Sequence, residues 1–137
     1  MKTNASMTIY NKYTEDQAEK YSATKISAVY WEDRKASNVI ASGGNISADQ
    51  SRLFIPMLKN LLTFKKPKAW KALVDKSVAW TLQVGDIVVK QLVDDEITTE
   101  FTITHLKAKY DDVMVISSVD TRDMGSMELR HWQVGLK

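Results

Sequence analysis

The sequence contains no cysteine, so disulfide bonds, thiolate nucleophiles and cysteine-ligated zinc are excluded by inventory. It also has no run of about eighteen apolar residues, the length that predicts a membrane span. The opening segment MKTNASMTIYNKYTED lacks the apolar stretch that is typical of a secretion signal. These absences predict a protein that is made and used without export and has no membrane partner.

Neither sign of charge dominates the composition. Nineteen Lys and Arg residues face seventeen Asp and Glu residues, and the net charge of +2 is too small to indicate a nucleic-acid or membrane partner. Of the 137 residues, 44% are hydrophobic and 26% are charged, close to the average of globular proteins. Length and composition predict a single domain over residues 1–137.

Short β-prone runs recur along the whole chain. They are rich in valine, isoleucine, threonine, tyrosine and tryptophan, and polar or glycine-bearing turns separate them. The runs are 7–13, 24–31, 36–41, 53–57, 79–83, 86–92, 100–105, 113–119 and 129–134. The pattern predicts a mainly all-β fold, a small antiparallel β-barrel or sandwich of about seven to nine short strands.

Three linkers carry turn signals. The four residues EDRK at 32–35 have the length of a hairpin loop, and TRDMGSM at 121–127 is a polar turn that contains Gly125. In WTLQVGDIVV, Gly85 and Asp86 lie between two β-prone runs, and glycine adopts positive φ without steric cost. This last segment is the strongest hairpin signal of the sequence.

Residues 57–78 interrupt the β pattern, because the connection is too long for a hairpin turn. Apolar residues recur at helical spacing twice, over 57–62 and over 70–74, and Pro67 suits the first turn of the second segment. The spacing predicts one or two short amphipathic helices in this excursion from the β fold.

The glycine pair Gly43–Gly44, followed by Asn45, raises the question of a phosphate-binding loop. Neither G-x-x-x-x-G-K-[ST] nor G-x-G-x-x-G is present, and Pro56 stands where a helix would have to continue. We therefore interpret SGGNISAD as a loop that returns the chain to the strand LFIPM.

Two acidic clusters suggest a divalent cation. Asp94, Asp95 and Glu96 follow one predicted strand, and Asp111 and Asp112 precede another, so a fold that joined them could supply oxygen ligands. Neighbouring carboxylates on a strand point to opposite faces, however, and acids that flank turns commonly stay in water. A metal-dependent enzyme on the four aspartates remains an alternative.

No catalytic motif supports an enzyme. His105 and His131 are the only histidines, and they lack the H-E-x-x-H spacing of a zinc site; no G-x-S-x-G nucleophile elbow occurs. The sequence therefore predicts a protein that is not an enzyme and that uses neither metal nor cofactor.

The basic segment FKKPKAWKAL interleaves lysines with aromatic residues, as in single-strand nucleic-acid binders. The candidate residues are Phe64, Lys65, Lys66, Lys68, Trp70 and Lys71. The simpler interpretation is that Trp70 packs inward while the lysines stay solvated. The four tryptophans, at 31, 70, 80 and 132, are interpreted in the same way as core or cross-strand anchors, with subunit contacts as the alternative.

An ordered set of segments resembles a family of small virion proteins of long-tailed phages and prophages of Gram-positive bacteria. The segments are TIYNKY, ISAVYWEDRKASNVIASGGNISAD, LFIPM, WTLQVGDIVVK, DDEIT and KYDDVMVISSVDTRDMGSMELRHWQVG. Such proteins are minor structural or head-to-tail joining proteins of the stopper or head-completion class, small β-barrels with long loops. The resemblance says least over residues 59–77.

The resemblance implies a connector in the virion neck, assembled in the host cytoplasm. Copies of the chain would form a homo-oligomeric ring, six- or twelve-fold, below the portal or adaptor proteins. The ring would retain packaged double-stranded DNA in its channel and dock tail-completion or tail-tube proteins. Another neck tier, such as tail completion or terminator, and a single-stranded nucleic-acid binding barrel are the alternatives.

Within such a ring, two segments are candidates for the loop that narrows the channel. The first is the basic segment Phe64 to Lys71, and the second is the acidic segment Asp94 to Glu96. Lysines would hold phosphates, whereas acids suit a path along which DNA must slide. Gly43, Gly44 and Asn45 are expected to shape a contact between subunits.

Overall fold

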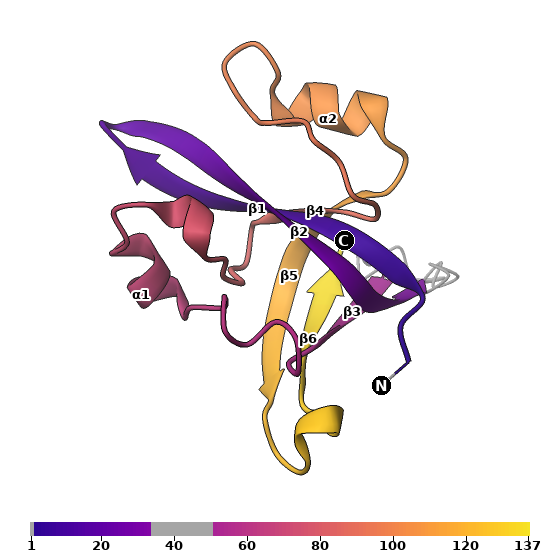
Figure 1. Ribbon diagram of the computed structural model, residues 1–137. Helices are drawn as coiled ribbons and strands as arrows, with labels where there is room; N and C mark the ends of the chain where they lie inside the picture. Colours follow the sequence, from indigo (N-terminus) through magenta and orange to yellow (C-terminus); the bar gives the residue numbers. More distant parts are fainter. Residues whose placement is uncertain (1, 34–50) are drawn as a thin grey trace, which may run out of the picture.

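The fold is a closed six-stranded antiparallel barrel with strand order β1-β2-β3-β6-β5-β4, seen in a computed structural model that describes residues 2–33 and 51–137 (Figure 1). The strands are β1 (Ala5–Glu15), β2 (Ala18–Asp33), β3 (Ser51–Pro56), β4 (Ile87–Val89), β5 (Val113–Arg122) and β6 (His131–Leu136). The prediction of a mainly all-β fold is confirmed, and of the two predicted architectures the structure has the barrel and not the sandwich. Six strands, below the predicted seven to nine, are found in the described ranges.

One large apolar cluster fills the barrel. Alternate strand residues point inward, as the twofold periodicity of a strand requires. The buried members are Met7, Ile9, Ile26, Val29, Trp31, Leu53, Ile55, Met57, Trp80, Leu82, Val88, Ile116, Trp132, Val134 and Leu136. All four tryptophans of the chain are buried, which confirms the interpretation of these residues as anchors of the core.

β1 is buried on both faces over residues 7–11. Met7 and Ile9 belong to the barrel core, whereas Tyr10 belongs to a second cluster outside the barrel. That second cluster includes Ile87 and Val89 of β4 and Leu106 of α2 (Ile103–Lys109). The helix α2 therefore covers the outer face of β1 and β4, which would otherwise expose apolar side chains to water.

The paired strands β1 and β2 extend beyond the barrel as an arm (Figure 1). A two-residue turn ends the arm, and both of its residues have positive φ, 54° at Asp16 and 64° at Gln17. Primed turns of this kind match the twist of an antiparallel pair. The arm lies between α1 (Pro67–Lys71) on one side and the segment before α2 on the other (Figure 1).

The excursion from β3 to β4 contains less helix than its periodicity predicts. Residues 58–63 form only hydrogen-bonded turns, with Leu61 N–H donating to Met57 O at 2.9 Å. α1 begins at Pro67, which confirms the prediction for this residue, and a short 3-10 turn, η1 (Lys76–Val78), follows. Leu58, Leu61 and Leu62 are exposed, so the first segment has no apolar surface to pack on that would stabilise a helix.

The predicted strand at 100–105 is wrong, because α2 occupies residues 103–105 and residues 100–102 form no strand. Phe101, Ile103 and His105 alternate as in a strand, and Phe101 does pack on the second cluster. From α2 onward, however, the residues that pack there are Ile103, Leu106 and Tyr110. These are spaced i, i+3 and i+7, on one helical face. The Thr102 N–H donates to His105 Nδ1 at 3.0 Å, which stabilises the first turn of the helix.

The predicted hairpin around Gly85 forms only in part. Gly85 has a φ of +96° and makes the turn, as predicted. Residues 79–83 form no strand, however, and contribute a single parallel bridge between Phe64 and Trp80. The chain enters β4 directly after the turn, and β4 ends at Val89 instead of residue 92. Beyond the strand, Val93 N–H donates to the side chain of Thr8.

Further boundaries differ from the predictions. The strands β1, β2 and β3 run over 5–15, 18–33 and 51–56 instead of 7–13, 24–31 and 53–57. Residues 127–129 form the 3-10 turn η2 (Met127–Leu129), so the last strand begins at His131 and not at residue 129. β5 extends past the predicted residue 119 to Arg122. The predicted strand at 36–41 and residues 34–35 of the predicted loop lie outside the described residues, whereas Glu32 and Asp33, predicted as loop, belong to β2.

Candidate functional site

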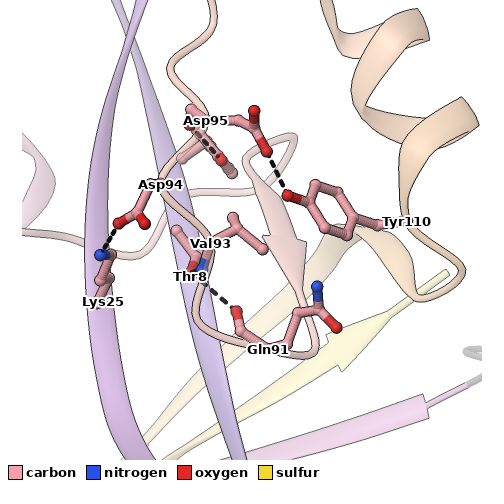
Figure 2. Close-up of polar contacts among 8 residues, drawn as sticks. Thr8, Lys25, Gln91, Val93, Asp94, Asp95 and Tyr110 are labelled. Atoms are coloured by element: carbon pink, nitrogen blue, oxygen red, sulfur yellow. Dashed lines mark hydrogen bonds and ion pairs between the residues drawn. The ribbon is translucent and has the colours of Figure 1, made fainter.

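The acidic segment after β4 is fixed to the barrel by ion pairs (Figure 2). Asp94 pairs with Lys25 of β2. The Asp95 carboxylate accepts hydrogen bonds from Lys109 Nζ at 3.0 Å and from the hydroxyl of Tyr110, and both donors lie at the end of α2. The two neighbouring carboxylates thus bind different cations on different elements. This segment, predicted as a candidate channel loop, is in fact fastened to both β2 and α2.

Polar contacts from β1 hold the same segment along its backbone. Thr8 Oγ1 donates to Gln91 O at 2.9 Å and accepts from Val93 N–H at 3.0 Å (Figure 2). Tyr10 donates its hydroxyl to Asp95 O at 2.6 Å. Burial and the nearby Asp95 carboxylate raise the pKa of Tyr10, so this donor keeps its proton.

The negative charge of Asp95 is neutralised within the protein, unlike the charge of a carboxylate that is free to bind a metal ion. Hydrogen bonds from Tyr110 and Lys109 lower the pKa of this carboxyl, so its charge is already compensated. Over residues 2–33 and 51–137, no group of three His, Asp or Glu side chains is placed to hold a metal ion. Asp111 and Asp112 are exposed beside α2, and the two histidines lie on separate elements.

A buried carboxylate, Asp86, organises a second polar cluster at the base of the arm. It is 1% exposed, and it accepts hydrogen bonds from Asn11 Nδ2 at 2.8 Å, the Lys12 N–H at 3.0 Å and Gln83 Nε2 at 3.0 Å. Asn11 also bonds the backbone of Thr81 in both directions. The cluster joins β1 to the turn before β4 and satisfies the backbone N–H and C=O of Thr81, which lies in no strand.

Asp86 is expected to make stability depend on pH. Burial raises the pKa of this carboxyl above its ordinary value of 3.8, and the hydrogen bonds oppose the effect only in part. The folded protein therefore binds the proton more tightly than the unfolded chain. The stability that proton binding by Asp86 contributes is fully present below pH 3.8. It is lost as the pH rises through the raised pKa of the folded state.

The measurement is the free energy of unfolding in urea at several pH values for the wild type and Asp86→Asn. We expect the wild type to lose stability relative to the variant as the pH rises from 3.8. Asp111→Asn, at an exposed aspartate, is the control for nonspecific charge effects. Parallel curves for the wild type and Asp86→Asn would contradict this assignment.

The basic segment is anchored by Trp70, which is 0% exposed. Its indole N–H donates to Ala79 O at 3.2 Å, and its ring meets Tyr13 of the arm edge-on, with centroids 5.8 Å apart. Lys76 lies over both rings. A tryptophan in this position cannot stack on a nucleotide base, so the single-strand binding interpretation loses its central residue.

The other residues of the basic segment lie near the surface. Phe64 is half-buried and packs on Trp132 and Trp80, with ring centroids 4.4 and 5.0 Å away. The four lysines at 65, 66, 68 and 71 are exposed, and none has an ion-pair partner within the described ranges. Aromatic and basic residues that are interleaved in sequence are thus separated in space, the former inside and the latter outside.

An open groove of about 710 Å³ lies beside this segment. Its apolar lining comes from Met57, Leu61, Phe64, Pro67, Ala69, Leu82, Val119 and Trp132. Its polar lining comes from Lys65, Lys66, Thr121, Asp123 and Arg130. The excursion forms one wall, and β5 with the start of β6 forms the other.

Five large apolar side chains are exposed on two neighbouring loops at this end of the barrel. They are Leu58, Leu61, Leu62, Met124 and Leu129. A hydrogen bond of 3.0 Å from Met57 N–H to Arg130 O joins the two loops. We call these five residues the apolar end.

Sequence reasoning missed the groove, the apolar end and the Asp86 cluster. The spacing of Leu58, Leu61 and Leu62 is the one signal in the sequence for the apolar end, but helical periodicity predicts packing, whereas these side chains are exposed. Gly43, Gly44 and Asn45 lie outside the described residues, so their predicted subunit contact stays a prediction.

Comparisons with known proteins add a family but no activity. A family model described as "Family of unknown function (DUF6751)" matches residues 2–137. No curated protein and no solved structure matches the chain. In the ranges that the structure describes, no helix has the length and apolarity that a membrane crossing requires.

Proposed function

We propose that this chain, which belongs to the DUF6751 family, is a structural subunit of a phage neck. In this role it is a head-to-tail connector of the stopper or head-completion type. Copies form a ring below the portal or adaptor, retain packaged DNA and dock the tail. The closed small barrel supports the proposal, since it is the fold that the sequence resemblance implies.

The observation that carries the assembly role is the apolar end. Leu62 is 95% exposed and Met124 is 85% exposed, although the barrel beneath them is fully packed. Large apolar side chains gathered on neighbouring loops are typical of surfaces that another protein covers. A ring subunit needs such surfaces, because heterologous contacts close a ring only when every copy uses them.

Neither of the two candidate channel loops is assigned a gating role in this proposal. Trp70 anchors the basic segment, and Lys25, Lys109 and Tyr110 fasten the acidic one. A loop that moves into a channel must be mobile, and a mobile loop makes few such contacts with the rest of its subunit. Retention of DNA is therefore assigned to the ring as a whole and not to a moving gate in either segment.

The test is a phage or prophage that encodes this chain and carries Leu62→Asp with Met124→Asp. Both side chains are exposed, so the variant is expected to fold and accumulate, while electron microscopy shows filled or leaking heads without tails. Leu62→Met with Met124→Leu is the matched control and should give complete particles. Deletion of the whole gene should reproduce the tailless phenotype.

The proposal fails if deletion particles keep their DNA and still carry tails. Monomers of the purified chain would not decide the matter, since a ring can require its partner for assembly. The apolar end is tested separately by comparing the double Asp variant with the deletion.

A further inference from the structure

Charge is segregated along the chain in a way that the small net charge hides. Residues 57–78 contain six lysines and one aspartate, a net charge of +5. The whole chain carries +2, so the remaining residues carry −3. The excursion is therefore a cationic segment of a chain whose other residues are acidic in sum, and it forms one wall of the groove described above.

The cations at the groove are available to a ligand. Lys65 and Lys66 are exposed, and neither they nor Arg130 forms an ion pair with any described residue. Arg130 uses its Nε to donate to Gly125 O at 3.0 Å, which orients the guanidinium and leaves its other nitrogens for a carboxylate. Asp123 is the one acidic side chain of the lining, so the cations outnumber it three to one.

The floor of the groove is apolar. Phe64, Pro67 and Val119 are partly exposed and supply its accessible apolar surface, and the buried Leu82 and Trp132 complete the apolar lining. At the rim stands Leu61, a member of the apolar end. A ligand that fills the groove must therefore bury apolar surface and also place negative charge beside the three cations.

We propose that this groove binds a segment of another protein in which a large apolar side chain is flanked by carboxylates. The apolar side chain lies on Phe64 and Val119, and the carboxylates pair with Lys65, Lys66 and Arg130. The inference concerns this surface alone and stands independently of the phage assignment.

Duplex DNA fits the groove less well. Phosphates would satisfy the lysines, but they would leave the apolar floor and the exposed Leu61 and Leu62 in water. Binding that is driven by phosphate contacts gains nothing from a floor of this kind. A partner that covers both the charges and the apolar surface gains free energy from each.

A second copy of the chain also fits poorly. Its most acidic segment that contains aromatic and aliphatic residues is DDEITTEF, residues 94–101. Lys25 and Lys109 already bind the carboxylates of Asp94 and Asp95, and Phe101 stacks on His105 with centroids 5.7 Å apart. The side chains that would have to enter the groove are thus already engaged within their own subunit.

The experiment is selection from a displayed library of random 12-residue peptides on the purified full chain. We expect enrichment of sequences with Asp or Glu within a few positions of Leu, Phe or Trp. The best peptide, labelled with fluorescein, then gives an affinity by anisotropy. Lys65→Glu with Lys66→Glu should weaken it at least tenfold, and added salt should weaken it further.

Lys2→Glu with Lys107→Glu is the matched control. It changes the net charge equally, at exposed lysines that do not line the groove, and should leave the affinity unchanged. Phe64→Ser tests the floor and should also weaken the peptide tenfold or more.

Four outcomes would overturn the proposal. One is a selection without acidic and apolar enrichment, and another is peptide binding that survives the Lys65→Glu, Lys66→Glu change. The third is a 20-base-pair DNA duplex that binds the wild type more tightly than the best peptide and loses affinity in the same variant. Self-association abolished by that variant would likewise replace the partner with a second copy.

Discussion

Trp70→Ala is expected to release the excursion from the arm and to cost about 3–5 kcal/mol of local stability. The substitution empties a fully buried site, removes the hydrogen bond to Ala79 O and removes the ring contact with Tyr13. Lys76 loses one of the two rings beneath it. Because α1 has only five residues, it cannot persist without this anchor.

Hydrogen exchange measures the effect directly. The amides of residues 70, 72 and 73 bond carbonyls within the helix and its end, and their exchange should accelerate about 100-fold or more. Strands β3 and β6 should keep their protection. Trp70→Phe, which retains the edge-on ring but loses the N–H, is the control and should show a much smaller change. Unchanged protection in Trp70→Ala would contradict the anchoring role.

Trp132→Ala is expected to destabilise the whole barrel, also by about 3–5 kcal/mol. Trp132 is 1% exposed and packs between Phe64 and Trp80, with ring centroids 4.4 and 5.3 Å away. It lies on β6, opposite Ile55 of β3 and Thr121 of β5. A cavity at this point loosens three strands at once, and the loss approaches the total stability of a typical domain.

Urea unfolding followed by circular dichroism gives the measurement. The midpoint should fall by about 2 M relative to the wild type, with every probe of the barrel moving together. Trp132→Phe keeps most of the ring area and should lose less than half as much. A local change confined to residues 57–78 would show that the aromatic cluster supports only the excursion.

The barrel could be predicted because its strands carry a local signal. Met7 and Ile9, or Leu53 and Ile55, alternate with residues of the opposite face, and this periodicity does not depend on the rest of the chain. The strand wrongly predicted at 100–105 has the same local alternation. Only Tyr10, Ile87 and Val89 on the outer face, which need a cover, make the helical arrangement of Ile103 and Leu106 the stable one.

The candidate site was less predictable, since its contacts join residues far apart in sequence. Asp94 meets Lys25 and Arg130 approaches Lys65 and Lys66 at one groove only after the barrel closes. Each residue is an ordinary charged side chain in the sequence. Trp70 is the exception. A tryptophan among lysines is expected to pack inward while the lysines stay solvated, and the structure confirms that Trp70 is buried.

The position of β6 between β3 and β5 decides when the protein can fold during its synthesis. β1 and β2 can pair as soon as they leave the ribosome, since only Asp16 and Gln17 separate them. β3 and β5, by contrast, keep unpaired edges until residue 136 has emerged. The nascent chain is thus an open sheet with two unpaired strand edges, which can pair with other chains and aggregate. The yield of folded protein in the cell therefore depends on how quickly β6 is synthesised.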